Sequence, residues 1–352
     1  MSNRIPVAVL AATGSVGQRF IQLLDCHPYF KVVALTASDR SVGKKFGDAC
    51  HWILPGDMPS WARDMEILPT APESASVPLA FSALPTDAAV ETEPAFARAG
   101  TVVCSNASAY RMPSDVSILF PEVNPEQAAI LPIQQKLRGW SGGIITNSNC
   151  TSTGVTVALK PLLDKFGINK VFAVSMQALS GAGYPGVASI DIIDNVIPFI
   201  KGEEEKVETE PRKMLGKLIG NEIVPADFVI SAHTNRVAVV DGHMVCLSVE
   251  LKEKATPEQV IEAMRAYQAP EISRDLPSAP NPVIIVRDES DRPQPRLDRM
   301  TGKGMATVVG RVRPDPIFGL KFVVLSHNTI RGAAGGSIYN AELLVKLGYI
   351  KK

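Results

Sequence analysis

The chain has 352 residues, of which 45% are hydrophobic and 20% are charged, and its 36 Lys and Arg residues balance its 36 Asp and Glu residues. This is the composition of a globular protein long enough for about two domains. A net charge of zero argues against a nucleic-acid or anionic-membrane partner, and no apolar run approaches the about 20 residues that span a bilayer.

The first 150 residues alternate between strand and helix patterns. Residues 4–11 form an apolar run ending in the turn AATGSVG, residues 15–24 have helical periodicity, and residues 31–37 resemble a second buried strand. A strand, a glycine turn, a helix and a strand within about 30 residues make a βαβ unit, which implies a parallel sheet. We therefore predict a Rossmann-like, doubly wound α/β domain over residues 1–150. Its remaining elements are expected at 79–83, 101–105 and 143–147 (strands) and at 86–99 (a helix).

Beyond residue 150 strand patterns outnumber helix patterns. The segment MVCLSVEL, 244–251, alternates apolar and polar residues, as in an antiparallel sheet with one solvated face. These patterns predict an α+β domain over residues 151–330, with a polar surface loop at 289–300. Its strands are expected at 170–177, 226–234, 244–251, 306–312 and 320–325, and helices at 187–199, 256–266 and, near the end of the chain, 335–347.

The turn AATGSVG, Ala11–Gly17, lies where a dinucleotide-binding turn would lie. Gly14 and Gly17 match the second and third glycines of GxGxxG, while alanines precede them. Small residues let backbone N–H groups approach a phosphate at the positive end of a helix. A plain tight turn is the alternative. In this βαβ context we predict that the turn binds a dinucleotide through Thr13, Gly14, Ser15 and Val16.

The end of the second predicted strand bears on the choice of dinucleotide. An NAD site usually places an acidic residue there, about 20 residues after the glycines. This chain has TASDRSVGKK, in which Ser38, Arg40 and Ser41 offer hydroxyls and a cation to a 2′-phosphate. Asp39 could instead accept from a ribose hydroxyl, and a solvated surface turn is a further alternative. We favour NADP.

Five cysteines and five histidines are scattered along the chain without a CxxC or HExxH pair. This spacing argues against a disulfide framework and against a structural metal site, and it favours a reducing, cytoplasmic location. The start of the chain also lacks the features of a signal peptide.

Cys150, in SNCTST, stands where a predicted strand passes into a helix. A thiol at a helix start lies near free N–H groups and the positive dipole, which lower its pKa toward neutrality. Pro161 should end or kink this helix. The alternative is a buried, inert cysteine, and the local pattern does not decide between them.

A thiolate nucleophile needs a partner for proton transfer. His243 follows the turn residues Asp241 and Gly242, and Arg236, seven residues earlier, also stands at the head of an apolar run. If these residues lie at the two ends of a short hairpin, Arg236 and His243 can face one pocket. A semi-exposed turn histidine is the alternative.

Six segments together resemble the aspartate-semialdehyde dehydrogenase family, in particular its archaeal and fungal branch, which also includes malonyl-CoA reductases. In chain order they are AATGSVGQ, SNCTSTG, MQALSGAGYPG, GEEEKVETE, NRVAVVDGH and NTIRGAAGGSI, and they extend over essentially the whole chain. The resemblance implies the reversible, NADP-dependent reductive dephosphorylation of L-4-aspartyl phosphate to L-aspartate 4-semialdehyde. This step leads to lysine, threonine, methionine and isoleucine.

The resemblance also implies a glyceraldehyde-3-phosphate-dehydrogenase-like fold. Residues 1–150 would bind NADP and be completed by a C-terminal helix at 331–352, and residues 151–330 would form a catalytic and dimerisation domain. Homodimers or homotetramers are expected, with small molecules as the other partners.

Specific roles follow for residues that match the family motifs. Cys150 would be the nucleophile, His243 the general acid and base, and Gln177 the residue that orients the substrate. The implied substrate ligands are Arg236 for the carboxylate, Glu203 for the amine (with Glu204 and Glu205 as alternative registers), and Asn106, Arg111 and Lys206 for the phosphate. Ser180, Gly181 and Asn328 match cofactor-contacting positions, and no metal is expected.

Two other functions fit part of the sequence. A malonyl-CoA reductase would share the nucleophile, the histidine and the NADP fold, and its basic residues would meet a CoA phosphate. A non-catalytic dinucleotide-binding regulator would keep only the fold. The presence of Cys150, Gln177, Arg236 and His243 together argues against the regulator.

Overall fold

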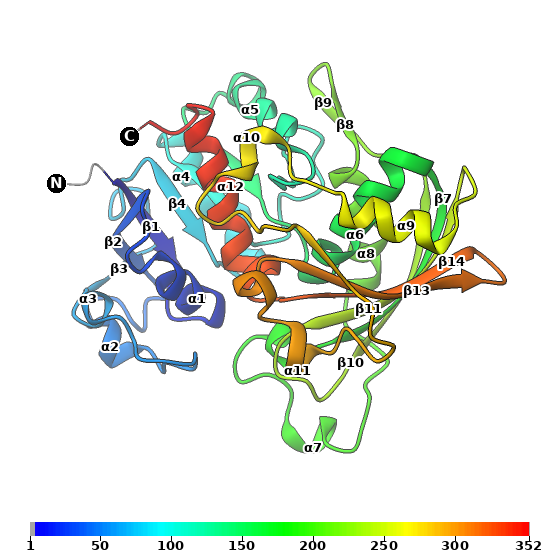
Figure 1. Cartoon of the computed structure of the whole chain (residues 1–352). Coiled ribbons are helices and arrows are strands. Elements are labelled where there is room, and N and C mark those ends of the chain that lie inside the picture. Colours follow the sequence, from blue (N-terminus) through cyan, green and yellow to red (C-terminus); the bar gives the residue numbers. More distant parts are fainter. Residues whose placement is uncertain (1–3, 352) are drawn as a thin grey trace.

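The computed structural model describes residues 4–351. These residues form two six-stranded sheets, and the first lies to the left of the second in Figure 1. The first sheet is parallel throughout, with the strand order β3-β2-β1-β4-β5-β6. This is a doubly wound order, and its direction reverses between β1 and β4, where such sheets bind ligands. The strands are β1 (Ile5–Leu10), β2 (Phe30–Thr36), β3 (Ile67–Leu68), β4 (Leu79–Ser82), β5 (Val102–Ser105) and β6 (Gly143–Thr146).

Apolar residues on both faces of these strands explain why helices cover the first sheet on both sides. Val7, Val9 and Phe81 are fully buried and belong to the same hydrophobic cluster as Tyr339 and Leu343 near the end of the chain. The last helix therefore returns to the first sheet (Figure 1). The helices around this sheet are α1 (Ser15–Leu24), α2 (Phe46–Ala49), α3 (Ser60–Arg63), α4 (Thr86–Arg98), the 3₁₀ helix η1 (Pro125–Ala129), α5 (Ile130–Arg138) and α12 (Gly335–Lys346).

The second sheet is mixed, with the order β10-β7-β11-β14-β13-β12. Its middle pairs are antiparallel, as the alternating pattern predicted, whereas β10 and β12 each pair in parallel at an edge. β11 alternates between buried and more exposed residues, with Cys246 on the exposed face. The strands are β7 (Ile168–Gln177), β10 (Val229–Arg236), β11 (His243–Leu251), β12 (Ile284–Arg287), β13 (Thr307–Asp315) and β14 (Gly319–Ser326), and β8 (Lys217–Ile219) and β9 (Glu222–Val224) form a separate hairpin.

Three helices pack against the buried face of this sheet, and the first of them begins at Cys150. α6 contacts β7, β11, β13 and β14, α8 contacts β10, and α9 contacts β12 and β13. Pro161 lies inside α6, so the expected end of the helix there is wrong; burial along most of α6 holds the helix together past the proline. The elements are α6 (Cys150–Phe166), η2 (Leu179–Ala182), α7 (Ser189–Ile192), α8 (Glu203–Met214), α9 (Pro257–Arg265), α10 (Glu271–Arg274), α11 (Pro295–Asp298), η3 (Thr301–Gly304) and the π-helical η4 (Ile330–Ala334).

Two predicted segments differ from the structure. Only Ser189–Ile192 of the expected helix 187–199 is helical, because Asp194 adopts a left-handed conformation and the apolar residues Ile190 and Ile193 point into solvent instead of a core. The expected loop at 289–300 contains α11, whose Asp298 is buried and pairs with Arg292.

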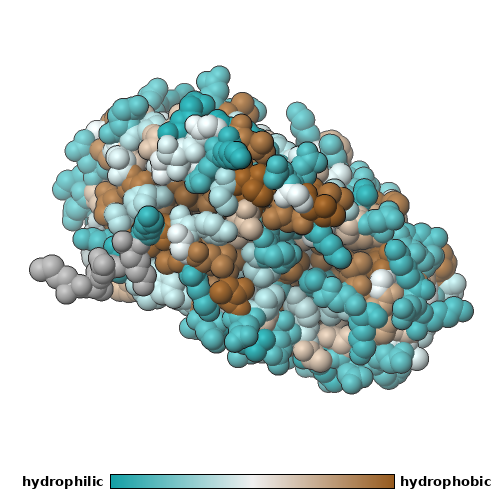
Figure 2. All heavy atoms as spheres, turned by 90° about the horizontal axis from the view of Figure 1, so that it is seen from above, coloured by the Kyte–Doolittle hydropathy of each residue, from teal (hydrophilic) through white to brown (hydrophobic). Residues whose placement is uncertain are grey.

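Hydrophobic and hydrophilic residues are interspersed over the face of the molecule seen from above (Figure 2). Within residues 4–351, no helix has both the length and the apolar character needed to cross a membrane.

Candidate active site

A pocket of about 330 Å³ opens at the carboxyl ends of the strands of the first sheet. Its walls come from the segments after β1, β4, β5, β6 and β14, together with α8, η2 and η4. It lies on the side of the sheet where doubly wound folds bind ligands. Residues from these segments include Ser15, Thr86, Asn106, Cys150, Gly181 and Gly332.

Cys150 is the first residue of α6, as the sequence predicted. Asn149 caps the helix: its Oδ1 accepts hydrogen bonds from the Thr151 and Ser152 N–H groups at 2.9 and 3.2 Å. These two amides are therefore already hydrogen-bonded. The expected stabilisation of a thiolate by free N–H groups of the first turn is reduced for this reason.

His243 lies directly beside the thiol. The distance from Cys150 Sγ to His243 Nε2 is 3.2 Å, and His243 Nδ1 accepts a hydrogen bond from Ala178 N at 3.0 Å. A neutral ring that accepts at Nδ1 carries its proton on Nε2. The imidazole thus directs an N–H group at the sulfur.

Burial and nearby charges move the pKa values of Cys150 and His243 away from neutrality. Burial and the Glu203 carboxylate raise the pKa of Cys150 to about 12, against Arg111, Arg236 and Lys206, which lower it. Burial, followed by the nearby Arg236, lowers the pKa of His243 to about 3. In the free protein the thiol pKa is therefore raised, and the expectation of a value lowered toward neutrality is wrong for this state.

Arg236 and His243 do not belong to one hairpin, because β7 lies between β10 and β11. They nevertheless lie close together beneath η2. A Cβ atom added to Gly181 would lie 2.9 Å from Arg236 Nη1 and 3.0 Å from His243 Cε1, so only glycine fits there without displacing them. Arg236 Nη1 donates to Ala178 O at 2.7 Å, and the guanidinium is buried beneath η2.

Glu203 joins two of the other candidate residues to the cap residue of α6. Its carboxylate accepts from Asn149 Nδ2 at 2.9 Å, from Gln177 Nε2 at 3.2 Å and from Lys206 Nζ at 3.2 Å. Glu204 instead accepts from the backbone of Thr234 in β10, and Glu205 is exposed. Of the three consecutive acids, Glu203 is the one in the pocket.

Arg111 lines the pocket beside Asn106, from the loop after β5. Its Nη2 donates to Asn106 O at 2.6 Å and its Nη1 to Glu210 Oε1 at 2.9 Å. Glu210 is a residue that the sequence analysis missed. The available signal was its position on α8, seven residues after Glu203 and therefore on the same helix face.

The glycine turn packs closely against the start of α1 and borders the pocket. Gly14 caps α1 without a side-chain hydrogen bond, and a Cβ on Gly17 would lie 2.4 Å from Ala11 O, so the turn and the helix can approach closely only with glycine. Ser15 and Val16 line the pocket that contains Cys150, and Thr13 lies in the same turn. A dinucleotide can therefore extend from this turn to the thiol.

The other cofactor candidates fall into two groups. Ser180, Gly181 and Asn328 line the pocket, where Asn328 Nδ2 donates to Ser180 Oγ at 2.7 Å and its Oδ1 accepts from Gly242 N at 2.8 Å. Ser38, Arg40 and Ser41 lie at the surface turn after β2, outside the pocket. Within residues 4–351, no three potential His, Cys, Asp or Glu ligands gather as a metal site.

Known proteins match this chain over nearly its whole length. The family described as semialdehyde dehydrogenase, NAD binding domain, matches residues 6–130, and the family described as semialdehyde dehydrogenase, dimerisation domain, matches residues 159–331. Aspartate-semialdehyde dehydrogenase of Archaeoglobus fulgidus is 54% identical over 97% of this chain and 98% of its own length. The enzyme of that name from Schizosaccharomyces pombe is 47% identical over 97% and 98%.

A solved structure agrees in fold as well as in sequence. The crystal structure of aspartate semialdehyde dehydrogenase with NADP from Candida albicans aligns with a TM-score of 0.91 and 41% identity, and the alignment covers 99% of this chain and 100% of that one.

Proposed function

The chain belongs to the aspartate-semialdehyde dehydrogenase family, and on this basis we propose that it interconverts L-4-aspartyl phosphate and L-aspartate 4-semialdehyde with NADP. The reaction would serve the biosynthesis of lysine, threonine, methionine and isoleucine. The observation that carries the proposal is the 3.2 Å contact between Cys150 Sγ and His243 Nε2 in a pocket that also contains the glycine turn, Arg111 and Lys206.

Cys150 is proposed as the nucleophile. In the biosynthetic direction its thiolate attacks the acyl carbon, the bond to phosphate breaks, and a thioester forms. Reduction gives a hemithioacetal, whose collapse releases the aldehyde and returns the thiolate. NADPH, when bound, would supply the hydride in this direction, and NADP⁺ would accept it in the reverse direction.

His243 is proposed as the group that manages the proton at the reacting centre. Its Nε2–H points at the sulfur, where it can stabilise the thiolate and then the oxygen of the hemithioacetal. Donating a full proton requires a doubly protonated ring, whose Nδ1–H would face the Ala178 N–H. The acid and base role therefore requires this hydrogen bond to break or the ring to turn.

The charged residues of the pocket suit a substrate with two negative ends and one amine. Arg111 and Lys206, with Asn106, are proposed to bind the phosphate; Glu203 is proposed to bind the amine and Gln177 to orient the acyl group. Arg236 would hold the carboxylate through a planar pair of hydrogen bonds. Gly181 of η2 lies directly against this guanidinium, so a carboxylate bound there would also lie beside η2.

The cofactor is proposed to lie along the glycine turn, with Thr13, Gly14, Ser15 and Val16 at its phosphates. Ser180, Gly181 and Asn328 would line its reactive end, since they border the pocket of Cys150. Ser38, Arg40 and Ser41 are proposed to bind the 2′-phosphate at the surface turn after β2, where their side chains are accessible.

The assembly and location are also proposals. Residues 1–150 with 331–352 would form the cofactor domain and residues 151–330 the second domain, through which a homodimer or homotetramer forms; the dimerisation-domain match over residues 159–331 supports this. A cytoplasmic location is supported by the five cysteines, all of which are free.

The decisive assay is phosphate-dependent oxidation of aspartate semialdehyde, run in parallel with NADP and NAD. We expect activity that requires phosphate and favours NADP. Cys150→Ser should abolish turnover, with kcat falling by at least about 10³-fold, because no thioester can form. A preference for malonyl-CoA over aspartyl phosphate in the reductive direction would contradict the substrate, and full activity of the serine variant would contradict the mechanism.

A further inference from the structure

The inward face of α8 carries four charged residues in alternating sign. Glu203, Lys206, Glu210 and Lys213 are spaced three, four and three residues apart, so they lie on one face of the helix. Glu203, Glu210 and Lys213 are 7%, 1% and 2% exposed, respectively. The mechanism proposed above uses only the first two residues of this face. Glu210 and Lys213 are buried ionisable groups without an assigned role.

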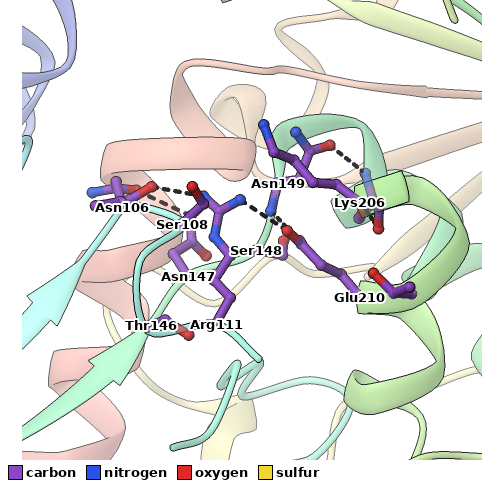
Figure 3. Close-up of polar contacts among 12 residues, drawn as sticks. Asn106, Ser108, Arg111, Thr146, Asn147, Ser148, Asn149, Lys206 and Glu210 are labelled. Atoms are coloured by element: carbon purple, nitrogen blue, oxygen red, sulfur yellow. Dashed lines mark hydrogen bonds and ion pairs between the residues drawn. The ribbon is translucent and has the colours of Figure 1, made fainter. Parts of the chain in front are cut away.

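Each carboxylate oxygen of Glu210 binds a different part of the site. Oε1 accepts from Arg111 Nη1 at 2.9 Å, and Oε2 accepts from the backbone N–H of Asn149 at 2.5 Å. Figure 3 shows Arg111 and Glu210 pointing toward one another from the loop after β5 and from α8. Asn149 caps α6 and immediately precedes Cys150. A single side chain therefore connects the candidate phosphate ligand with the turn that carries the nucleophile.

Arg111 can bind an anion while it stays paired with Glu210. A guanidinium has five N–H donors, and only two hydrogen bonds are made, to Glu210 and to Asn106 O. Arg111 Nε is buried and has no partner within residues 4–351, and the residue lines the pocket. A phosphate that enters beside Cys150 would therefore meet a guanidinium whose hydrogen-bonding capacity is not used up by Glu210 and Asn106.

Lys213 holds the backbone of the same loop. Its Nζ donates to Arg111 O at 2.6 Å and to Pro113 O at 2.7 Å. The guanidinium end of Arg111 is thus fixed by Glu210 and its main chain by Lys213, both from α8. This arrangement restrains Arg111 more than a surface cation would be restrained.

We propose that Glu210 is a positioning residue. It orients the Arg111 guanidinium for phosphate binding and holds the Asn149–Cys150 turn near that guanidinium. This inference rests on the proposed function. Without the carboxylate, a buried guanidinium loses the partner that compensates its charge, and the Asn149 N–H loses its acceptor. Phosphate binding and the reactivity of Cys150 should then change together.

Glu210→Gln tests this, because glutamine keeps the size of the side chain but presents an NH₂ group to one of two donors. In the oxidative direction we expect the KM for phosphate to rise and kcat to fall, each by about tenfold, since hydrogen bonds to charged groups are strong. The KM for NADP should stay within about twofold, because the glycine turn does not contact Glu210. Phosphate should also lose its ability to protect Cys150 from iodoacetamide, measured on the Cys150 peptide by mass spectrometry.

Glu208→Gln is the matched control. Glu208 lies on the same helix and also accepts from a backbone N–H, that of Ala232 in β10, at 3.0 Å. It should leave the KM for phosphate and the protection of Cys150 unchanged. An unchanged KM for phosphate in folded Glu210→Gln would overturn the proposal. Absence of phosphate-dependent turnover in the wild-type protein would instead overturn the proposed function.

A comparison made in the Arg111→Gln background keeps the test valid if Glu210→Gln alone does not fold. Arg111→Gln and the pair Arg111→Gln with Glu210→Gln remove one or both charges, and removing both leaves no uncompensated charge. If Glu210 acts on phosphate through Arg111, adding Glu210→Gln to Arg111→Gln should change the KM for phosphate by less than about twofold. A further tenfold rise would show that Glu210 acts independently of Arg111 and would overturn the proposal.

Discussion

At the scale of single residues, the ionisation of Cys150 depends on burial, on one acidic side chain and on three basic side chains. Burial, the largest cause, and then Glu203 raise its pKa, whereas Arg111, Arg236 and Lys206 lower it. Because the net effect raises the pKa, this environment favours the thiol form of Cys150 over the thiolate. A substrate amine that pairs with Glu203 would neutralise the carboxylate that raises the pKa of the Cys150 thiol.

Glu203→Gln should therefore speed the alkylation of Cys150 in the free protein. Removing the carboxylate lowers the thiol pKa, so at a fixed pH below that pKa the thiolate fraction rises, by about three- to tenfold. The rate with iodoacetamide is measured on the Cys150 peptide, since Cys26 and Cys246 are also exposed. Glu204→Gln, whose carboxylate accepts from Thr234 N, serves as the control. Equal rates in the two variants would contradict the assigned cause.

At the scale of elements, η4 packs against the start of α6 with almost no free space. A Cβ on Gly332 would lie 2.8 Å from Cys150 Cβ and 2.9 Å from its Cα. Gly335, at the start of α12, is equally crowded, but its neighbours are Met305 and Ile330. The close contact of η4 with α6 thus limits the positions that Cys150, the candidate nucleophile, can occupy.

Gly332→Ala should consequently damage catalysis more than Gly335→Ala. Both overpack a buried junction and should reduce the free energy of unfolding by about 1–3 kcal/mol. Only Gly332→Ala pushes directly on Cys150, and a shift of about 1 Å can reduce the rate about 10²-fold. The comparison needs kcat for both variants and their urea midpoints. Equal losses of kcat at equal stability would argue against positioning by η4.

At the scale of the whole molecule, Arg331 connects the C-terminal segment to Glu122, which lies in the loop between β5 and η1. Its Nε and Nη2 both donate to Glu122 Oε1, at 2.8 and 2.6 Å, and its guanidinium lies 3.8 Å from the centre of the Phe120 ring. Both partners of this ion pair are buried. The pair helps to keep α12 on the first sheet while η4 contacts α6.

Arg331→Met should reduce the free energy of unfolding by about 3–5 kcal/mol, because it leaves the buried Glu122 carboxylate without its partner. Arg265→Met is the control: Arg265 pairs with Asp288 at the surface, where the loss should stay within about 1 kcal/mol. Urea denaturation measures both. A loss for Arg331→Met no larger than for Arg265→Met would contradict a structural role for the buried pair.

The elements predicted well are those whose signals are local. The βαβ unit from β1 to β2 was placed within a residue or two of its observed bounds, because a glycine turn and apolar periodicity mark its parts. The start of α6 at Cys150 was likewise marked by the strand before it. By contrast, α8 was not predicted, because its inward face is charged and pattern rules count apolar residues.

The site was predictable as a set of residues but not as an arrangement. Motifs identified Cys150, His243, Arg236, Glu203, Lys206 and Arg111, and the structure places all of them within one neighbourhood. The hairpin expected to join Arg236 to His243 does not exist, because β7 is inserted between β10 and β11. Strand insertion depends on pairing between distant segments, which no local pattern encodes.

The sequence by itself determined the doubly wound first sheet, the position of the candidate nucleophile and the family. These depend on periodicity, turn residues and ordered motifs, which are read within short windows. Only the tertiary structure decided which of three consecutive acids faces the thiol, which nitrogen of His243 carries the proton, and that Glu210 joins Arg111 to the Cys150 turn. These outcomes depend on charges brought together from distant segments and on burial that changes their pKa values, and both arise only when the chain is folded.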